Sequence, residues 1–409
     1  MNTGSARAQE QPSPDARPRL HVALVTETYP PEINGVANTL AQLARGLARC
    51  GHQVSLVRPR QPVDRRNARQ PGELLVGGVP LPGYRGLRFG WPAFGTVQRR
   101  WREARPDAIY IATEGPLGHA ALQAAMCLGI PTLTGFHTQF QQYCRHYGVG
   151  LLMRPIVSLL RRFHNHSGAT LVPTRALQRD LAAAGFRNLH VLSRGVDTER
   201  FAPAYRSAAL RASWGCGDET VVALYVGRIA AEKHVDLAIE AFDRIRRTQP
   251  DSRCVLVGDG PALAQLRRQH PDHVYTGAKV GAELAAHYAS ADLFVFPSLT
   301  ETFGNVLTEA LASGLAPIAF DYAAAREHLH HGRNGYSIPM ADRTAFLAQA
   351  EQAVSDHAQL RRLGQEARRT AESLSWEHVI RELEHHLFSV IDCADTQSER
   401  HEPIPATVE

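Results

Sequence analysis

Short apolar runs recur along the chain at intervals that suit alternating strands and helices. In the first half, such runs are followed by turn residues and then by stretches with helical spacing. They lie at residues 20–25, 54–57, 107–111, 131–136, 169–172 and 189–192. Continuous apolar runs of this length are typical of strands that are buried on both faces of a parallel sheet. The first half of the chain therefore predicts a doubly wound α/β domain.

The second half repeats the same alternation. Its apolar runs lie near residues 221–226, 253–257, 273–276, 292–296 and 316–320. A chain of 409 residues is longer than one hydrophobic core usually supports. We therefore expect the fold class α/β with two Rossmann-like doubly wound parallel-sheet domains. The predicted boundaries are a disordered tail at 1–18, an N-terminal domain at 19–196, a C-terminal domain at 197–372 and a polar tail at 393–409.

Two pairs of charged side chains follow strands of the second half. Arg228 and Lys233 come after the run near 221–226, and Glu301 and Glu309 come after the run near 292–296. The carboxyl ends of parallel strands share one edge of a sheet, and open α/β sheets bind ligands there. Residues 302–304 precede a predicted helix, whose free backbone N–H groups favour an anion. Glu309 lies two turns along this helix, so the two carboxylates can bind different parts of an elongated ligand such as a nucleotide sugar.

These motifs are Gly-Arg-Ile-Ala-Ala-Glu-Lys at 227–233 and Glu-Thr-Phe-Gly-Asn-Val-Leu-Thr-Glu at 301–309. With them, the chain resembles the retaining glycosyltransferases of family 4 over about residues 20–392. The resemblance implies the GT-B fold, in which two domains face each other across a cleft, and a helix at 373–392 that crosses back to the first domain. It also implies a retained configuration, with the acceptor hydroxyl attacking from the face that the nucleoside diphosphate leaves.

The resemblance assigns a role to each of five side chains. Arg228 and Lys233 would hold the diphosphate, Glu301 would contact the donor sugar and Glu309 the ribose hydroxyls. His137, directly after a strand, would be a catalytic-site residue near the donor sugar on the acceptor side. The expected donor contacts also include Gly35, Gly227, Gly277, Lys279, Phe303, Gly304, Asn305 and Val306.

Lysine usage gives independent support for the diphosphate assignment. The chain has 45 basic residues, and only Lys233 and Lys279 among them are lysines. An ammonium group binds phosphate as a flexible point charge, a geometry that the planar guanidinium does not reproduce. We expect no cofactor and no metal, since the chain contains no Asp-x-Asp motif. The histidines of 164–166 and 328–331 lack further ligands at zinc spacing.

The motifs at 27–36 and 136–140 favour GDP-mannose as the donor and a lipid or glycan as the acceptor. One alternative is a UDP-sugar-dependent glucosyl- or sulfoquinovosyl-type glycolipid transferase. Others are a sugar-nucleotide epimerase of the same fold and a pyridoxal-phosphate phosphorylase with Lys233 as a Schiff base. A non-catalytic sugar-nucleotide binding protein is the last alternative, and the intact pair Glu301 and Glu309 argues against it.

Charge is divided unevenly between the two halves. Residues 1–196 hold 24 Arg and 10 acidic residues, a net charge of +14, which leaves −9 of the total +5 for the remainder. We expect an anionic membrane surface as a partner of the first domain, and the alternative is a solvated basic face without a partner. Nucleic acid is not expected, because aromatic residues do not interleave with the basic ones. Six cysteines without a Cys-x-x-Cys pair, and no secretory signal, favour the cytoplasm.

A segment at 151–162 has blocks of apolar and basic residues. If it is an exposed amphipathic helix, its Leu and Ile side chains would enter the headgroup region while Arg154, Arg161 and Arg162 meet anionic lipid. The competing interpretation buries its leucines in the core of the first domain. A peripheral position on the inner face of the cytoplasmic membrane depends on the first interpretation.

Overall fold

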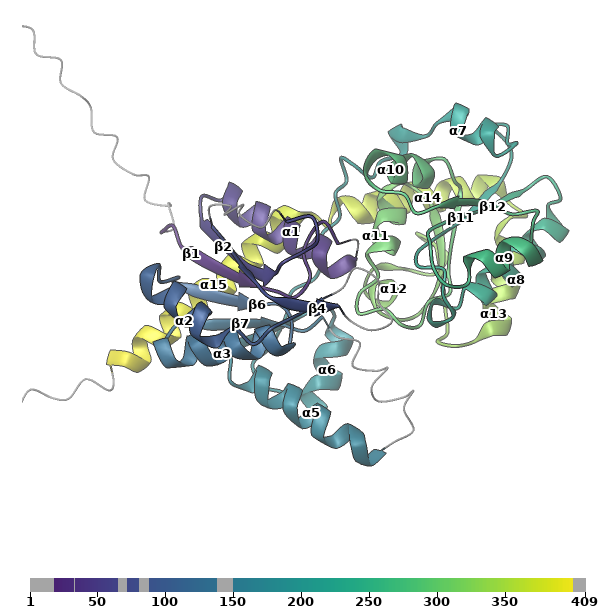
Figure 1. Ribbon diagram of the computed structural model, residues 1–409. Helices are drawn as coiled ribbons and strands as arrows, with labels where there is room; N and C mark the ends of the chain where they lie inside the picture. The colour runs from purple at the N-terminus through teal and green to yellow at the C-terminus, as the bar shows by residue number, and fades with distance from the viewer. Residues whose placement is uncertain (1–17, 33, 65–71, 81–87, 138–149, 400–409) are drawn as a thin grey trace, which may run out of the picture.

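The computed structural model describes residues 18–399, with the exception of residues 33, 65–71, 81–87 and 138–149 (Figure 1). Most of the two predicted tails lies outside these residues. The described chain forms two parallel sheets, each flanked by helices on both faces, in two lobes side by side. This confirms the predicted α/β fold of two Rossmann-like domains.

The N-terminal sheet has seven parallel strands in the order β3-β2-β1-β6-β7-β8-β9. Their bounds are His21–Val25 (β1), Gln53–Pro59 (β2), Glu73–Val76 (β3), Ala108–Ile111 (β6), Thr132–Gly135 (β7), Ala169–Val172 (β8) and Leu189–Val191 (β9). The helices are Gly35–Arg49 (α1), Phe94–Glu103 (α2), Pro116–Leu128 (α3), Gly150–Asn165 (α5) and Arg175–Ala183 (α6). Two short strands, Gly78–Pro80 (β4) and Arg88–Gly90 (β5), form an antiparallel pair beside the sheet.

The C-terminal sheet has six parallel strands in the order β12-β11-β10-β13-β14-β15. Their bounds are Val222–Val226 (β10), Arg253–Val257 (β11), Val274–Gly277 (β12), Leu293–Phe296 (β13), Ala316–Phe320 (β14) and Tyr336–Ile338 (β15). The helices are Ala208–Ser213 (α7), Val235–Thr248 (α8), Leu263–Gln269 (α9), Gly281–Ala289 (α10), Asn305–Ala312 (α11), Ala324–His328 (α12), Arg343–Ala353 (α13) and His357–Glu372 (α14). Two short 3-10 turns lie at Pro203–Tyr205 (η1) and Ala231–Lys233 (η2).

The central strands are apolar on both faces because helices cover each side of each sheet. Every residue of β10 and every residue of β13 is buried. One face of the C-terminal sheet packs on α8 and α13, and the other packs on α11 and α14. This burial explains why the sequence pattern along the strands is continuous rather than alternating.

The last helix, Trp376–Glu399 (α15), belongs to the core of the N-terminal domain. Ile380, Leu383 and Leu387 are at most 2% exposed and pack with β1, β6 and α1. Gly46 of α1 is needed for this contact, since a Cβ atom there would lie 2.3 Å from the Ile380 side chain. Figure 1 shows α15 in yellow among the purple and blue elements of the first domain. The helix continues beyond residue 392, into the segment that the sequence predicts as a polar tail.

Candidate active site

Lys233 and Glu301 are brought together by neighbouring strands. Strands β10 and β13 pair in parallel, so the loops that follow them leave the same edge of the sheet. Lys233 Nζ lies 2.5 Å from Glu301 Oε1 and also donates to the Thr300 carbonyl oxygen at 3.3 Å. Ser298 Oγ donates to the same Glu301 oxygen at 2.7 Å. Without a ligand, the predicted diphosphate cation and the predicted sugar-binding carboxylate therefore neutralise each other.

Arg228 follows Gly227 at the end of β10 and points into solvent more than Lys233 does. Its guanidinium donates to Glu232 Oε1 at 2.9 Å, and both side chains are 39% exposed. The Arg228 carbonyl oxygen accepts the Tyr225 hydroxyl at 3.0 Å, which fixes the backbone of the loop. An exposed ion pair of this kind is weak and can be exchanged for a phosphate contact at small cost.

The amino end of α11 meets the N-terminal domain. Gly304 caps the helix at φ 98°, a left-handed conformation in which any side chain would be strained. Asn305 Nδ2 lies 3.5 Å from the carbonyl oxygen of Gly35, at the start of α1. The Phe303 ring is 2% exposed and packs in the core, so only its backbone is available to a ligand. Val306 is half-buried in the first turn.

Glu309 lies on α11, apart from the pair formed by Lys233 and Glu301. Its carboxylate accepts the Tyr288 hydroxyl at 3.0 Å, and burial raises its pKa to about 7. It borders a cavity of about 20 Å³ between the domains, which also involves Gln42 of α1, Arg200 of the connecting segment and Trp376. The two carboxylates thus lie in separate surroundings, as binding to different parts of one ligand requires.

Gly277 and Lys279 stand at the edge of the sheet, beyond β11. Gly277 ends β12 in a left-handed conformation, with open space where a Cβ atom would be. Lys279 Nζ lies 3.5 Å from Glu283 Oε2 in the first turn of α10. The donor contacts expected at Gly277 and Lys279 remain predictions.

The His137 ring is turned toward the interior of the N-terminal domain. Its Nδ1 accepts from Arg194 at 2.9 Å, and because an arginine can only donate, Nε2 carries the proton that reaches the Tyr110 hydroxyl at 3.1 Å. Burial, and then the Arg194 charge, hold the His137 pKa well below its usual value. The ring is therefore neutral. The His137 carbonyl oxygen, by contrast, accepts from Thr302 of the C-terminal domain at 3.0 Å.

Arg194 is a buried residue near His137 to which the sequence assigned no role. It is 4% exposed, donates to the Thr39 hydroxyl and lies 6.0 Å from the centre of the Phe303 ring. It thereby links α1, His137 and the residue before the cap of α11. An arginine two residues after the expected strand at 189–192 is the sequence signal that could have indicated this position.

A second group that the sequence did not single out lies after β1. Glu27 is 7% exposed, accepts the Leu117 N–H at 3.0 Å at the start of α3, and has its pKa raised to about 7 by burial. Glu32 accepts from Thr28 and Gln61, and burial raises its pKa as well. These carboxyl groups lie at the carboxyl edge of the N-terminal sheet.

The histidine motifs for which zinc was not expected have other partners. His164 is 1% exposed and bonds Thr134 at 2.9 Å and Glu114 at 3.3 Å, and His166 bonds the carbonyl oxygen of Arg162. The His328 ring packs edge-on against Phe303, with centroids 5.8 Å apart. In the described part of the chain, neither motif belongs to a group of metal-ligating side chains.

Comparison with known proteins identifies the family of the chain. Residues 33–200 match the model of Glycosyltransferase Family 4, and residues 207–370 match that of Glycosyl transferases group 1. The GDP-mannose-dependent alpha-mannosyltransferase of Mycobacterium tuberculosis is 34% identical over 385 residues, 93% of this chain and 99% of that protein. Sulfoquinovosyl transferase SQD2 of Arabidopsis thaliana is 29% identical over 373 residues, 88% of this chain and 72% of that protein.

Among solved structures, sucrose-phosphate synthase from Thermosynechococcus elongatus superimposes with a TM-score of 0.74 at 18% identity. The match covers 92% of this chain and all of that one. Fold and site together define a glycosyltransferase of the GT-B class that acts on a nucleotide sugar. More specifically, the chain belongs to glycosyltransferase family 4.

Proposed function

We propose that this enzyme transfers mannose from GDP-mannose, with retention of configuration, to a hydroxyl group of a lipid or glycan acceptor. The observation that carries the proposal is the Lys233–Glu301 pair, 2.5 Å apart at the carboxyl edge of the C-terminal sheet. A diphosphate arriving at Lys233 takes over the cation and releases Glu301 for the donor sugar. The 34% identity to an enzyme named for GDP-mannose favours this donor.

The charge on the departing GDP is met by the chain itself. Lys233, Arg228 and the free N–H groups before α11 are donors aimed at an anion that gains charge in the transition state. Glu309 binds the ribose hydroxyls through the carboxylate that now accepts from Tyr288. This assignment needs no metal ion at the diphosphate.

The N-terminal edge is suited to an uncharged partner. His137 is neutral and Glu27 has a pKa raised to about 7, so neither presents a full charge of fixed sign at neutral pH. Hydroxyl groups of an acceptor, which both donate and accept, can bind a carboxyl group such as Glu27 without a desolvated charge. His137 acts here as a positioning residue, through its carbonyl contact with Thr302.

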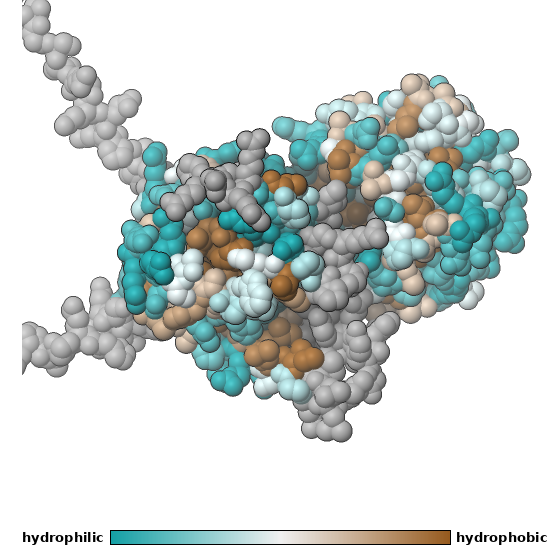
Figure 2. Space-filling model, in the orientation of Figure 1, coloured by the Kyte–Doolittle hydropathy of each residue, from teal (hydrophilic) through white to brown (hydrophobic). Residues whose placement is uncertain are grey.

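A membrane surface is proposed as the place where a lipid acceptor is met. On α5, Ile156 is 42% and Leu159 is 55% exposed, and Arg162 is exposed beside them. Val157 and Leu160 of the same helix pack inward, so one face belongs to the core and the exposed face is the one proposed to meet lipid. Figure 2 shows apolar surface over the part of the N-terminal domain where α5 lies in Figure 1. In the described residues, no helix combines the length and apolarity that spanning a bilayer requires.

The donor is tested by thermal shift with GDP-mannose, UDP-glucose, UDP-sulfoquinovose and ADP-glucose. A ligand that binds only the folded state raises its stability by RT ln(1 + [L]/Kd). We expect the largest shift with GDP-mannose, and transfer of labelled mannose to lipid acceptors in a vesicle assay. A larger shift with a UDP sugar would overturn the donor assignment.

The second candidate is transfer of a UDP-bound sugar such as sulfoquinovose. It is favoured by the 29% identity to the Arabidopsis enzyme over 88% of this chain. Sulfoquinovose carries a sulfonate, so this donor requires a further cation near the sugar. The same thermal shift series distinguishes the two candidates.

A further inference from the structure

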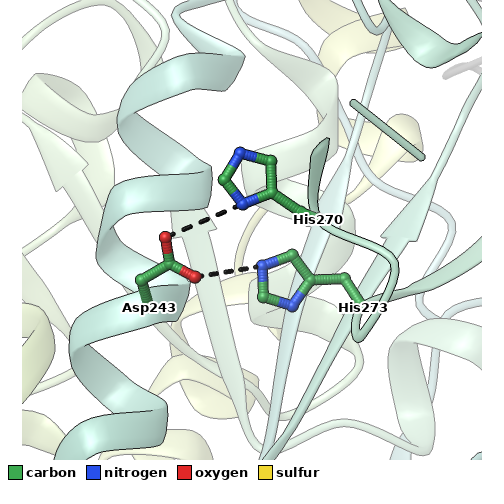
Figure 3. A group of neighbouring side chains, drawn as sticks. All are labelled: Asp243, His270 and His273. Carbon is green, nitrogen blue, oxygen red and sulfur yellow. Dashed lines mark ion pairs between the residues drawn. The ribbon is translucent and has the colours of Figure 1, made fainter. Parts of the chain in front are cut away.

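Three metal-ligating side chains meet on the outer side of the C-terminal domain. Asp243 lies on α8, His270 ends α9, and His273 precedes β12. One carboxylate oxygen of Asp243 is 3.8 Å from His270 Nδ1 and the other is 3.5 Å from His273 Nε2. Figure 3 shows both rings directed at the same carboxylate. One ligand atom from each residue can be chosen so that all three lie within 4.8 Å of one another.

The backbone holds the two rings in this arrangement. His273 N–H donates to the His270 carbonyl oxygen at 3.3 Å, which closes a tight turn. The rings stack with centroids 5.8 Å apart and planes inclined by 3°. Asp243 is positioned by α8, whose apolar face, including Phe242, is buried against the sheet. Ligands from a helix and a tight turn are rigid enough to form a defined site.

His273 is the second, independent indication of a ligand. Its side chain is 1% exposed, yet neither of its ring nitrogens has a hydrogen-bond partner in the described structure. A buried polar group without a partner costs on the order of 1–3 kcal/mol. A bound cation would satisfy the nitrogen that faces Asp243.

We propose that Asp243, His270 and His273 form a structural binding site for a divalent ion of the zinc class. Two imidazoles and a carboxylate suit Zn²⁺, Co²⁺ or Ni²⁺ better than Mg²⁺ or Ca²⁺, which take oxygen ligands. In a tetrahedral zinc site, ligand atoms lie about 3.4 Å apart, as follows from bonds of about 2.1 Å. With one ligand atom from each residue the separations reach up to 4.8 Å, and rotation of the half-buried His270 ring would shorten them toward this value.

The nearby charges are compatible with such an ion. Arg246, one turn along α8 from Asp243, is engaged with Asp272 at 3.3 Å. Asp272 lies between the two histidines in the sequence and adds negative charge to the surroundings. Figure 1 shows α8 and α9 on the side of the C-terminal domain that faces away from the first domain. The site is therefore separate from the proposed donor site, and its ion would tie α8 to the turn before β12.

The test uses the full-length, untagged protein, stripped of metal and titrated calorimetrically with Zn²⁺. We expect one ion per chain and a higher thermal midpoint in its presence. His270→Ala and Asp243→Asn should each weaken binding by at least about tenfold, a loss of about 1.4 kcal/mol. His378→Ala is the matched control, because His378 is exposed and pairs with Glu382 at 3.3 Å on α15.

Both substitutions are at half-buried positions, so unfolding in urea without metal checks that the variants remain folded. Equal Zn²⁺ affinity in the wild type, His270→Ala and Asp243→Asn would overturn the proposal, as would Mg²⁺ binding with equal affinity. A weakening seen only in the control would do the same. Sugar transfer is not a readout here, so failure of this proposal is distinct from failure of the proposed function.

Discussion

The facing edges of the two sheets differ in how they treat charge. At the C-terminal edge, Lys233 and Glu301 form an ion pair of opposite full charges. At the N-terminal edge, burial raises the Glu27 pKa to about 7 and keeps His137 neutral. The first arrangement is the one proposed to bind the diphosphate. The second, in which the neutral His137 ring contacts the buried Arg194 guanidinium, is the one proposed to meet acceptor hydroxyl groups. The net charges of the two halves, +14 and −9, would have suggested the reverse.

This contrast shows that the charge of a binding site is set locally. Several of the arginines behind the +14, such as Arg99, Arg100 and Arg102 on α2, are exposed and lie on helices. The groups at the strand ends instead take their charge from burial and from one or two partners. Net charge informs the search for a surface partner and says little about the reaction.

The largest expected effect comes from removing Lys233, the cation at the carboxyl edge of the C-terminal sheet. Lys233→Ala should lower turnover by roughly 10²–10³, because a donor to the departing diphosphate is lost. The free energy of unfolding should change by only about 1 kcal/mol, since the pair is partly solvated. Arg361→Ala is the control, because Arg361 is an exposed surface cation paired with Glu219 at 2.9 Å, and it should leave turnover unchanged. Near-full activity of Lys233→Ala in a GDP-mannose transfer assay would contradict the assignment of Lys233 to the diphosphate and, with it, the contrast between the two edges.

The raised pKa of Glu27, at the edge of the N-terminal sheet, can be tested through the pH dependence of the free energy of unfolding. The Glu27 pKa is raised from 4.5 to about 7 in the folded chain, so the unfolded chain releases this proton first as pH rises. Stability should therefore be fully present below about pH 4.5 and fall as pH approaches 7. Glu27→Gln keeps the acceptor for Leu117 N–H and should be more stable than the wild type at pH 8, by on the order of 3 kcal/mol at most. Urea unfolding at pH 4, 6 and 8 measures this, with exposed Glu103→Gln as the control.

Glu309 belongs to the C-terminal domain, yet it resembles Glu27 of the N-terminal domain, because burial raises its pKa to about 7. Glu309→Ala should weaken GDP binding by about tenfold, in keeping with the loss of a hydrogen bond to a charged group. KM should rise with little change in kcat, since ribose is bound alike in ground and transition states. Tyr288→Phe, which removes the present partner of this carboxylate, should have a smaller effect. Unchanged GDP affinity in calorimetry would exclude the ribose role.

The surface charge of the N-terminal domain is tested with vesicles. Leu159→Glu should reduce binding to anionic vesicles several-fold, because an apolar side chain at the headgroup boundary is replaced by a like charge. Tyr205→Glu, at an exposed apolar position after the domain connection, is the control. Co-sedimentation that is equal for neutral and anionic lipid, or independent of salt, would contradict a role of the net positive charge of residues 1–196 in membrane binding.

The smallest expected effect is that of chelation. If Lys233, Arg228 and the start of α11 carry the diphosphate, EDTA should leave turnover unchanged. A lower thermal midpoint in EDTA, without a lower rate, would instead report the ion held by Asp243 and the two histidines. Loss of activity that Mg²⁺ or Mn²⁺ restores would show that Lys233, Arg228 and the start of α11 do not suffice and that the diphosphate needs a metal ion.

The fold was largely predictable because buried parallel strands have a simple pattern. The expected run at 292–296 and β13 at Leu293–Phe296 nearly coincide, and the same holds for β8 and β11. Short edge elements such as β15 and the β4–β5 pair gave no run long enough to detect. Each of these strands pairs with only one other strand, so its residues need not form a continuous apolar run, and their packing depends on contacts distant in the sequence.

The proximity of Lys233 and Glu301 was predictable from one rule, that neighbouring parallel strands end at one edge. Other parts of the site depend on contacts between distant residues, which periodicity does not encode. The His137 ring faces Arg194, 57 positions away, and Thr302 reaches His137 across 165 positions. The cluster around Asp243 was missed for the same reason, since its histidines lie a strand and a helix away from α8.

The return of α15 has a consequence for how the chain matures during synthesis. Leu383 and Leu387 are 0% exposed in the core of the first domain, yet they are among the last residues of the described chain to be made. While the C-terminal domain is being translated, the first domain presents an open apolar groove along α1. Its completion therefore waits until α15 has been synthesised. Truncations before residue 376 should yield a nascent chain that depends on chaperones, even though every strand of both sheets has already been synthesised.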